Sequence, residues 1–296
     1  MFRKILPVMA ASLIALNAGA AMAQNTTITI GDQLEPPHLD PTSAAAGAID
    51  NVVYANIYEG LTRFAADGSV IPGLAESWDI SEDGLGYTFH LHSGVKFHDG
   101  SDMNAADVVF SLNRARAEDS TNAQKGLFAA IANVEALDDM TVQVTLSQPT
   151  GAFLFNMAWG DAVIVPEEAT EEQLKTAPNG TGAFVFSGWI PGDSITITRN
   201  DAYWGTPARL ESATFKYISD PTAAFAAMMA GDVDAFPVFP APENLAQFAA
   251  DPRFSVIVGS TEGETILSTN NLMPPLDNVL VREAIAHAID RQAIID

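Results

Sequence analysis

Residues 87–110 read YTFHLHSGVKFHDGSDMNAADVVF, and this stretch holds the clearest structural signals in the chain. Residues 87–91 alternate apolar and polar side chains, which predicts a half-buried strand. An Asp-Gly turn follows, and Asn104 is then well suited to cap the start of a helix. Val108 and Leu112 are four positions apart and predict the apolar face of that helix. A strand, a turn and an amphipathic helix in quick succession indicate a protein that mixes both kinds of secondary structure.

The regions on either side continue this mixture. Residues 27–30 and 142–146 alternate like strands, and a Pro-Gly-Asp turn at 191–193 predicts a hairpin. Residues 49–61 repeat apolar side chains every four positions, which predicts a helix. The pattern indicates an α/β protein of the mixed α+β kind, and 296 residues are enough for two domains.

The first residues have the pattern of an export signal. Arg3 and Lys4 form a short positive region, an apolar run follows, and residues 21–23 read Ala-Met-Ala, an A-x-A cleavage site. A bilayer span needs about 20 apolar residues, and this run is shorter. We therefore expect a signal peptide at residues 1–23, cleaved after Ala23.

Composition excludes several classes of protein. The chain has no cysteine, which excludes disulfides, cysteine metal sites and thiol nucleophiles. A bacterial lipoprotein needs a cysteine just after its signal, so we do not expect a lipid anchor. The formal net charge of −23 opposes binding to nucleic acid. These features predict a protein that is free in the periplasm.

Short segments with a recognisable order and spacing run through the chain. They are LDP at 39–41, YEGL at 58–61, PGLAESW at 72–78, the block at 87–111, GTGAF at 180–184, AGDVD at 230–234 and VREAIAHAIDR at 281–291. Together they resemble family 5 of the extracellular solute-binding proteins, the dipeptide, oligopeptide and nickel receptors of ABC importers. The resemblance covers nearly all of the chain after the expected signal, and one small departure is Asn104, where the family more often has threonine.

The resemblance implies a periplasmic binding protein-like fold of class II, with two lobes that close on a ligand and an extra subdomain on the first lobe. The implied division is lobe I at 24–52 and 166–262, the extra subdomain at 53–165, and the start of lobe II at 263–296.

Family members are considerably longer than this chain. The predicted helix at 282–296 also has an apolar face with no following element to cover it. We therefore expect a C-terminally truncated chain whose second lobe is mostly missing, and which binds ligand weakly or not at all by itself.

The resemblance also implies residues that face the ligand. The loop after the first strand would meet it, and the Glu35 carboxylate suits a ligand ammonium group. The alternative for Glu35 is a solvated loop carboxylate. The alternative for the stretch 261–264 is a plain connector between the lobes. Trp159 is expected either to form an aromatic wall or to pack in the core. The candidates are Glu35, Pro37, His38, Trp159, Val238, Phe239, Thr261, Glu262 and Gly263.

Metal binding is a weaker interpretation. His90 and His92 share one face of the predicted strand and could hold a transition metal, but they lie in the ordinary strand-and-turn block of the family. Acidic residues at 81–84 and 231–234 lack the spacing of a calcium loop. We expect no metal and no cofactor.

The expected function is therefore capture of a peptide and its delivery to a membrane permease and ATPase, by a receptor that is a monomer. A nickel or metal chelate, an opine and an oligosaccharide are alternative ligands. A secreted hydrolase is a more distant alternative, because the chain lacks G-x-S-x-G, G-K-[ST] and H-E-x-x-H motifs. We expect no catalytic residues.

Overall fold

The computed structural model describes residues 25–44, 46–259 and 266–295. The chain divides into two compact units, Met1–Asn244 and Leu245–Asp296. The expected signal peptide and the candidates Thr261, Glu262 and Gly263 lie outside the described residues. Within the described part, the helices are too short or too polar to cross a membrane.

The larger unit contains two four-stranded sheets. The first has the order β1-β10-β9-β8 and consists of β1 (Thr27–Asp32), β10 (Ser212–Tyr217), β9 (Ser194–Arg199) and β8 (Phe184–Ile190). Strands β1 and β10 are parallel, whereas the other neighbours are antiparallel. The predicted hairpin at 191–193 is confirmed, because it joins β8 to β9.

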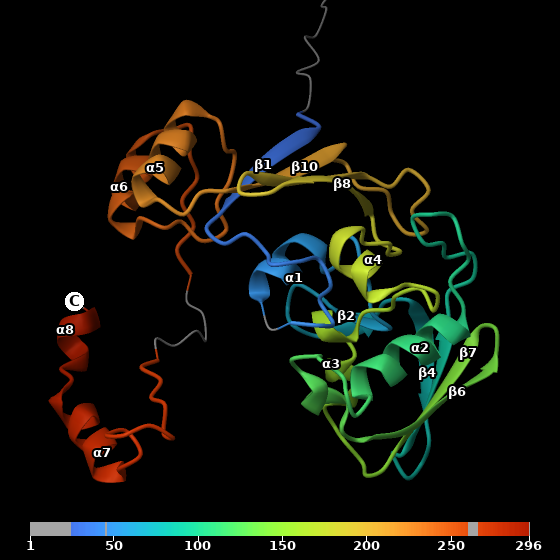
Figure 1. Ribbon diagram of the computed structural model, residues 1–296. Coiled ribbons are helices and arrows are strands. Elements are labelled where there is room, and N and C mark those ends of the chain that lie inside the picture. The colour runs from blue at the N-terminus through green and yellow to red at the C-terminus, as the bar shows by residue number, and fades with distance from the viewer. Residues whose placement is uncertain (1–24, 45, 260–265, 296) are drawn as a thin grey trace, which may run out of the picture. The chain divides into compact units, whose positions relative to one another are not determined.

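Helices α1 (Gly47–Val53) and α4 (Glu171–Thr176) lie beside this first sheet (Figure 1). Ile49 and Val52 of α1 and Leu174 of α4 share one apolar cluster with Ile195 and Phe215 of the sheet. Burial of these side chains away from water holds the helices against the strands.

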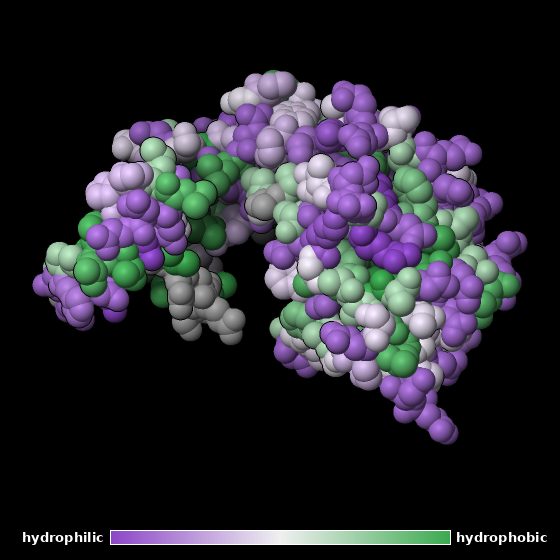
Figure 2. Space-filling model, turned by 60° about the horizontal axis from the view of Figure 1, so that its bottom comes forward, coloured by the Kyte–Doolittle hydropathy of each residue, from purple (hydrophilic) through white to green (hydrophobic). Residues whose placement is uncertain are grey.

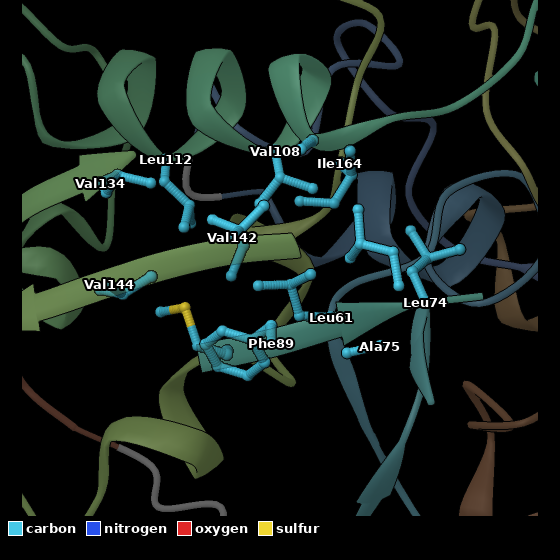
Figure 3. Packing of buried hydrophobic residues seen from close by; sticks show 14 of the residues in the cluster. Leu61, Leu74, Ala75, Phe89, Val108, Leu112, Val134, Val142, Val144 and Ile164 are labelled. Atoms are coloured by element: carbon cyan, nitrogen blue, oxygen red, sulfur yellow. The ribbon is translucent and has the colours of Figure 1, made fainter. Parts of the chain in front are cut away.

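The second sheet has the order β4-β5-β7-β6, and all of its pairs are antiparallel. Its strands are β4 (Ala75–Ile80), β5 (Gly86–Leu91), β7 (Thr141–Leu146) and β6 (Ile131–Asp138). Helix α2 (Ala105–Arg116) covers one face, and Val108 and Leu112 point toward Val142 of β7 (Figure 3).

The strand, turn and helix expected at 87–110 are confirmed. Tyr87, Phe89 and Leu91 are buried along β5 while the residues between them are not. The Asn104 side chain accepts a hydrogen bond from the Ala106 N–H at 2.7 Å and caps α2.

The helix predicted at 49–61 is too long. Helix α1 ends at Val53, and Tyr54 has an extended backbone. Ile57 and Leu61 continue the apolar spacing although they lie beyond the helix. They are buried because the chain turns back into the core. Gly182 and Phe184 donate backbone hydrogen bonds to Ile57 and Asn56 at 2.9 Å, replacing the bonds of a continuing helix.

Shorter elements complete the larger unit. They are β2 (Thr62–Phe64), β3 (Val70–Pro72), η1 (Lys125–Phe128), α3 (Phe153–Asn156), η2 (Gly160–Ala162), α5 (Pro221–Ala230) and η3 (Pro242–Asn244).

The smaller unit has α6 (Leu245–Ala250), α7 (Val279–Ala288) and α8 (Arg291–Ile295). The single helix predicted at 282–296 is therefore wrong. Ile289 is extended, and the Asp290 carboxylate accepts from the Gln292 N–H at 3.1 Å, which starts a separate helix.

Buried apolar residues form two clusters, one on each sheet. Hydrophilic side chains cover much of the visible face of the larger unit (Figure 2). The predicted division of this region at residues 53 and 165 stays a prediction. The two compact units divide after Asn244, ahead of the predicted start of the second lobe at residue 263.

Candidate functional site

Three neighbouring segments of the first sheet run in the same direction and end at one edge. Strands β1 and β10 are parallel, with Asp32 opposite Tyr217 (Figure 1). On the other side of β1, Ile30 forms a parallel bridge with Ala235, and the Gly31 N–H donates to the Ala235 carbonyl at 2.8 Å.

The loops that leave these segments are residues 33–38, 218–220 and 236–239. We call the carboxyl ends of the three segments, together with these loops, the carboxyl edge. In open α/β sheets, ligands bind outside the carboxyl ends of parallel strands where the connections diverge. The carboxyl edge is therefore the candidate ligand site of the larger unit.

Glu35 anchors the loop that follows β1. Its Oε1 accepts hydrogen bonds from Trp189 Nε1 at 2.7 Å and from the Gly192 N–H at 2.9 Å. Both donors belong to the β8–β9 hairpin, and Glu35 is half-buried. The carboxylate holds the loop against the sheet, so the solvated loop carboxylate is the wrong alternative. Its ligand role stays a prediction.

The end of the same loop is also held in place. Pro37 is exposed, whereas His38 is half-buried and its Nδ1 accepts from the Asp40 N–H at 3.2 Å. Burial lowers the pKa of His38 below its usual value, although the nearby Asp40 opposes this. We therefore expect a neutral His38 at neutral pH.

Asp40 is fully buried and pairs with Arg114 Nη2 at 2.8 Å. Burial alone would raise the pKa of Asp40, but hydrogen bonds from Thr42 and the Arg114 guanidinium outweigh it and lower the pKa. The buried ion pair ties the first loop to α2.

Asp32 and Tyr217 occupy the ends of the two parallel strands. Asp32 Oδ2 accepts from Asn51 Nδ2 on α1 at 2.8 Å, and its Oδ1 accepts from the Gln33 N–H at 2.7 Å. The Tyr217 hydroxyl is buried with no hydrogen-bond partner. Burial, with added effects of Asp32 and Glu35, raises the pKa of Tyr217. The sequence placed Asp32 in the loop that follows the predicted strand at 27–30, and no pattern pointed to Asn51 or Tyr217.

Val238 and Phe239 lie in the segment that leaves the carboxyl edge beside β1. Val238 is 71% exposed, and Phe239 packs edge-on against Phe236 with ring centroids 5.4 Å apart. The Phe236 ring covers Gly31, where a Cβ atom would lie only 2.2 Å from it. The structure therefore brings these two candidates to the same edge as Glu35.

Trp159 lies in the turn at 158–161. It is 40% exposed and contacts Phe64 and Phe155, so it is not a core residue. The hydroxyl of Tyr54, the residue that directly follows α1, donates to the Ala158 carbonyl at 2.5 Å and holds this turn against the end of the helix. The short stretch 51–54 thus contacts this turn through Tyr54 and the end of β1 through Asn51.

The histidines of the second sheet are engaged with neighbours. His90 Nε2 lies 2.9 Å from Asp79, and His92 Nδ1 lies 3.7 Å from Glu76. The His92 ring also packs on Trp204. Over the residues that the structure describes, no group of three or more histidine or acidic side chains is arranged to hold a metal ion.

A hollow of about 650 Å³ lies between residues 97–107 and 166–179. It contains none of the predicted ligand residues. Five acidic side chains line it: Asp99, Asp102, Asp107, Glu167 and Glu168. Asp107 is satisfied within the protein, since it accepts from the N–H groups of Asn104 and Glu167 at 2.9 Å.

Comparison with known proteins now adds to this geometry. Residues 69–296 match the model of the bacterial extracellular solute-binding proteins, family 5 Middle. The chain belongs to this family. The family resemblance of the sequence motifs is thereby confirmed.

Individual members of family 5 are similar over nearly the whole chain. The glutathione-binding protein GsiB of Pectobacterium atrosepticum is 34% identical over 96% of this chain, which covers 56% of GsiB. The chain thus spans a little more than half the length of such relatives.

Solved structures of family members show the same fold. The periplasmic binding protein DppA of Helicobacter pylori, in complex with the peptide STSA, has a TM-score of 0.81 and 29% identity; the match covers 91% of this chain and 57% of DppA. The binding protein MoaA of A. tumefaciens R10, in complex with mannopinic acid, has a TM-score of 0.82 and 30% identity, with 92% and 57% coverage. The α/β periplasmic binding protein fold is therefore confirmed.

Proposed function

We propose that this family 5 chain is the ligand-capturing component of an ABC importer, which binds a peptide or peptide-like solute and presents it to a membrane permease and its ATPase. The observation that carries the proposal is the carboxyl edge, where three parallel segments end and loops 33–38 and 236–239 emerge together. In α/β proteins, ligands bind where such loops diverge at the carboxyl ends of parallel strands.

The choice of ligand class rests on similarity. GsiB is a glutathione-binding protein, and the DppA structure contains a peptide. A mannopinic acid-like opine is the second candidate, because MoaA is comparably similar to this chain.

The site and setting follow from the same proposal. Glu35, Pro37, His38, Val238 and Phe239 are the proposed contacts at the carboxyl edge. Trp159 would add an aromatic surface beyond α1. We propose a periplasmic monomer, exported through the signal at 1–23, that releases its ligand chemically unchanged. The lobe and subdomain limits at 52, 165 and 262 belong to this proposal as well.

Uptake measurements test the function. Cells that carry the gene and cells in which it is disrupted are given labelled dipeptides, glutathione or mannopinic acid. We expect disruption to abolish uptake of one class, most strongly a peptide, while uptake of a free amino acid is unchanged. Unchanged uptake of all three, or turnover of peptides by the purified chain, would contradict the proposal.

Photo-crosslinking tests the site separately. A photo-reactive dipeptide is incubated with the purified chain, and the labelled fragments are mapped by mass spectrometry. Because the chain alone is expected to bind weakly, the photo-reactive dipeptide is used in large excess. We expect labelling within 33–38 and 236–239 that unlabelled peptide suppresses. Labelling confined to the hollow at 97–107 and 166–179 would place the ligand elsewhere.

A further inference from the structure

The carboxyl group of Asp50 on α1 is pressed against the turn that follows Trp159. A Cβ atom on Gly160 would lie 2.5 Å from Asp50 Oδ1, so a side chain at position 160 would collide with this carboxyl group. Asp50 Oδ1 is buried and has no hydrogen-bond partner. An unpaired carboxylate oxygen is costly to bury, which favours the neutral acid.

The charged groups around Asp50 favour the neutral acid too. Asp161 follows Gly160 directly, is only 7% exposed, and has the same sign of charge. Tyr54, which directly follows α1, is a neutral donor to the Ala158 carbonyl. The charge of Arg63 acts on Tyr54, where it opposes the rise in the pKa of that side chain, and the Arg63 Nε donates to the Pro72 carbonyl. Burial, and then the charge of Asp161, raises the pKa of Asp50 to about 6.

Two contacts connect the region around Asp50 to the residues on either side of Trp159. Tyr54 holds the carbonyl just before Trp159, and Asp50 contacts the glycine just after it. The indole lies among Phe64 and Phe155, with centroid distances of 6.4 and 6.2 Å. A displacement of Gly160 is therefore passed to Trp159 through one peptide bond.

We propose that Asp50 and the turn at 158–161 form a proton-controlled contact that sets the position of Trp159. The neutral acid packs against Gly160 and can donate its O–H to a neighbouring oxygen. The carboxylate is repelled by Asp161 and is drawn toward water, which loosens the contact. Ligand affinity would then change near pH 6; this consequence rests on the proposed function, whereas the contact itself does not.

Fluorine NMR of the chain labelled with 5-fluorotryptophan tests the contact between about pH 4.5 and about pH 8. A Trp159→Phe variant assigns the signal, and Trp78, Trp189 and Trp204 serve as internal references. We expect the Trp159 signal to shift with a midpoint at about pH 6, and the shift to disappear in Asp50→Asn. Asp161→Asn should move the midpoint to lower pH, because a negative neighbour is removed.

The matched control is Asp119→Asn, an exposed carboxylate, which should leave the midpoint unchanged. A Trp159 signal that does not titrate, or that titrates identically in Asp50→Asn, overturns the proposal. If Asp50→Asn does not fold, the Trp159 signal of Asp161→Asn becomes the test. A midpoint unchanged from the parent chain then overturns the proposal. A Trp159 signal that titrates as expected, together with uptake of peptide, glutathione and opine that gene disruption leaves unchanged, argues against the proposed function alone.

Discussion

Glu59 shows how one side chain can join three distant parts of the chain. Its Oε2 accepts from Thr181 Oγ1 at 2.8 Å and from Trp204 Nε1 at 2.9 Å, and its Oε1 accepts from the Tyr203 hydroxyl at 2.7 Å. Hydrogen bonds to an ionised acceptor are stronger than those between neutral groups. Glu59 lies in the YEGL motif and Thr181 in the GTGAF motif, so two sequence signatures of the family meet in one contact.

We expect Glu59→Gln to lower the free energy of unfolding by about 2 kcal/mol, because the new amide N–H₂ faces donors in place of an acceptor. Urea denaturation followed by circular dichroism measures this. Glu76→Gln is the control, since that side chain is 56% exposed beside His92 and should cost less than about 0.5 kcal/mol. Equal effects of the two variants would contradict this role of Glu59.

The Asp40–Arg114 pair gives a prediction with a pH dependence. Arg114→Met leaves Asp40 buried without its cation, and we expect a loss of about 3 kcal/mol at pH 7. The pKa of Asp40 is lowered in the folded protein, so this stability is present above the usual value of 3.8 and is lost as the pH falls through the folded value. The deficit of the variant should therefore shrink at acidic pH.

Denaturation at neutral pH and at steps down to about pH 2 measures the effect. Lys96→Met is the matched control, because it breaks the exposed Lys96–Asp102 pair, whose side chains are 50% and 75% exposed. Its cost should stay below about 1 kcal/mol at each pH. A deficit of Arg114→Met that grows on acidification would refute the assignment.

At the scale of elements, the start of α2 depends on its cap. The Asn104 side chain accepts from the Ala106 N–H, and Asp107 Oδ2 accepts from the Asn104 N–H at 2.9 Å. Together they satisfy two backbone donors that the first helical turn leaves open. Helix α2 then presents Val108 and Leu112 to the second sheet.

We expect Asn104→Ala to lower stability by about 1 kcal/mol, and Asn104→Thr to be nearly neutral because its hydroxyl can accept the same bond. Thermal unfolding of the two variants beside the parent chain checks this difference. Equal losses for alanine and threonine would show that another property of Asn104 matters.

At the scale of the whole molecule, the apolar core is concentrated in one unit. Among the described residues, Phe248 is the one buried apolar side chain that lies beyond Asn244. Several large apolar side chains of the smaller unit are exposed, including Ile257, Leu272 and Leu280. The stability of the chain should therefore come mainly from the larger unit.

A shortened chain of residues 24–244 tests this point. We expect it to unfold cooperatively, with a midpoint within about 4 °C of the full chain. A chain of residues 24–165 is the control, since it lacks β8, β9 and β10 and should not unfold cooperatively. A large loss of stability on removal of 245–296 would show that the smaller unit supports the core.

Several features of this protein follow from its sequence alone. The alternation at 87–91, the Asn104 cap and the spacing of Val108 and Leu112 predicted β5 and α2 correctly, because these signals act over a few residues. The ordered motifs were also sufficient to identify the family. A ligand-facing role for the loop at 33–38 stays a prediction.

Other features depend on contacts between distant residues. Helix α1 ends at Val53 because Gly182 and Phe184 bond to the chain after it, and apolar spacing cannot reveal such partners. The anchoring of Glu35 by Trp189 spans 154 positions. Tyr217 meets Asp32 only because β1 and β10 are paired in parallel. Local sequence thus determined elements such as β5 and α2, and the family. The placement of buried polar groups was decided by the tertiary structure, because a buried donor or acceptor must find its partner wherever the fold brings one.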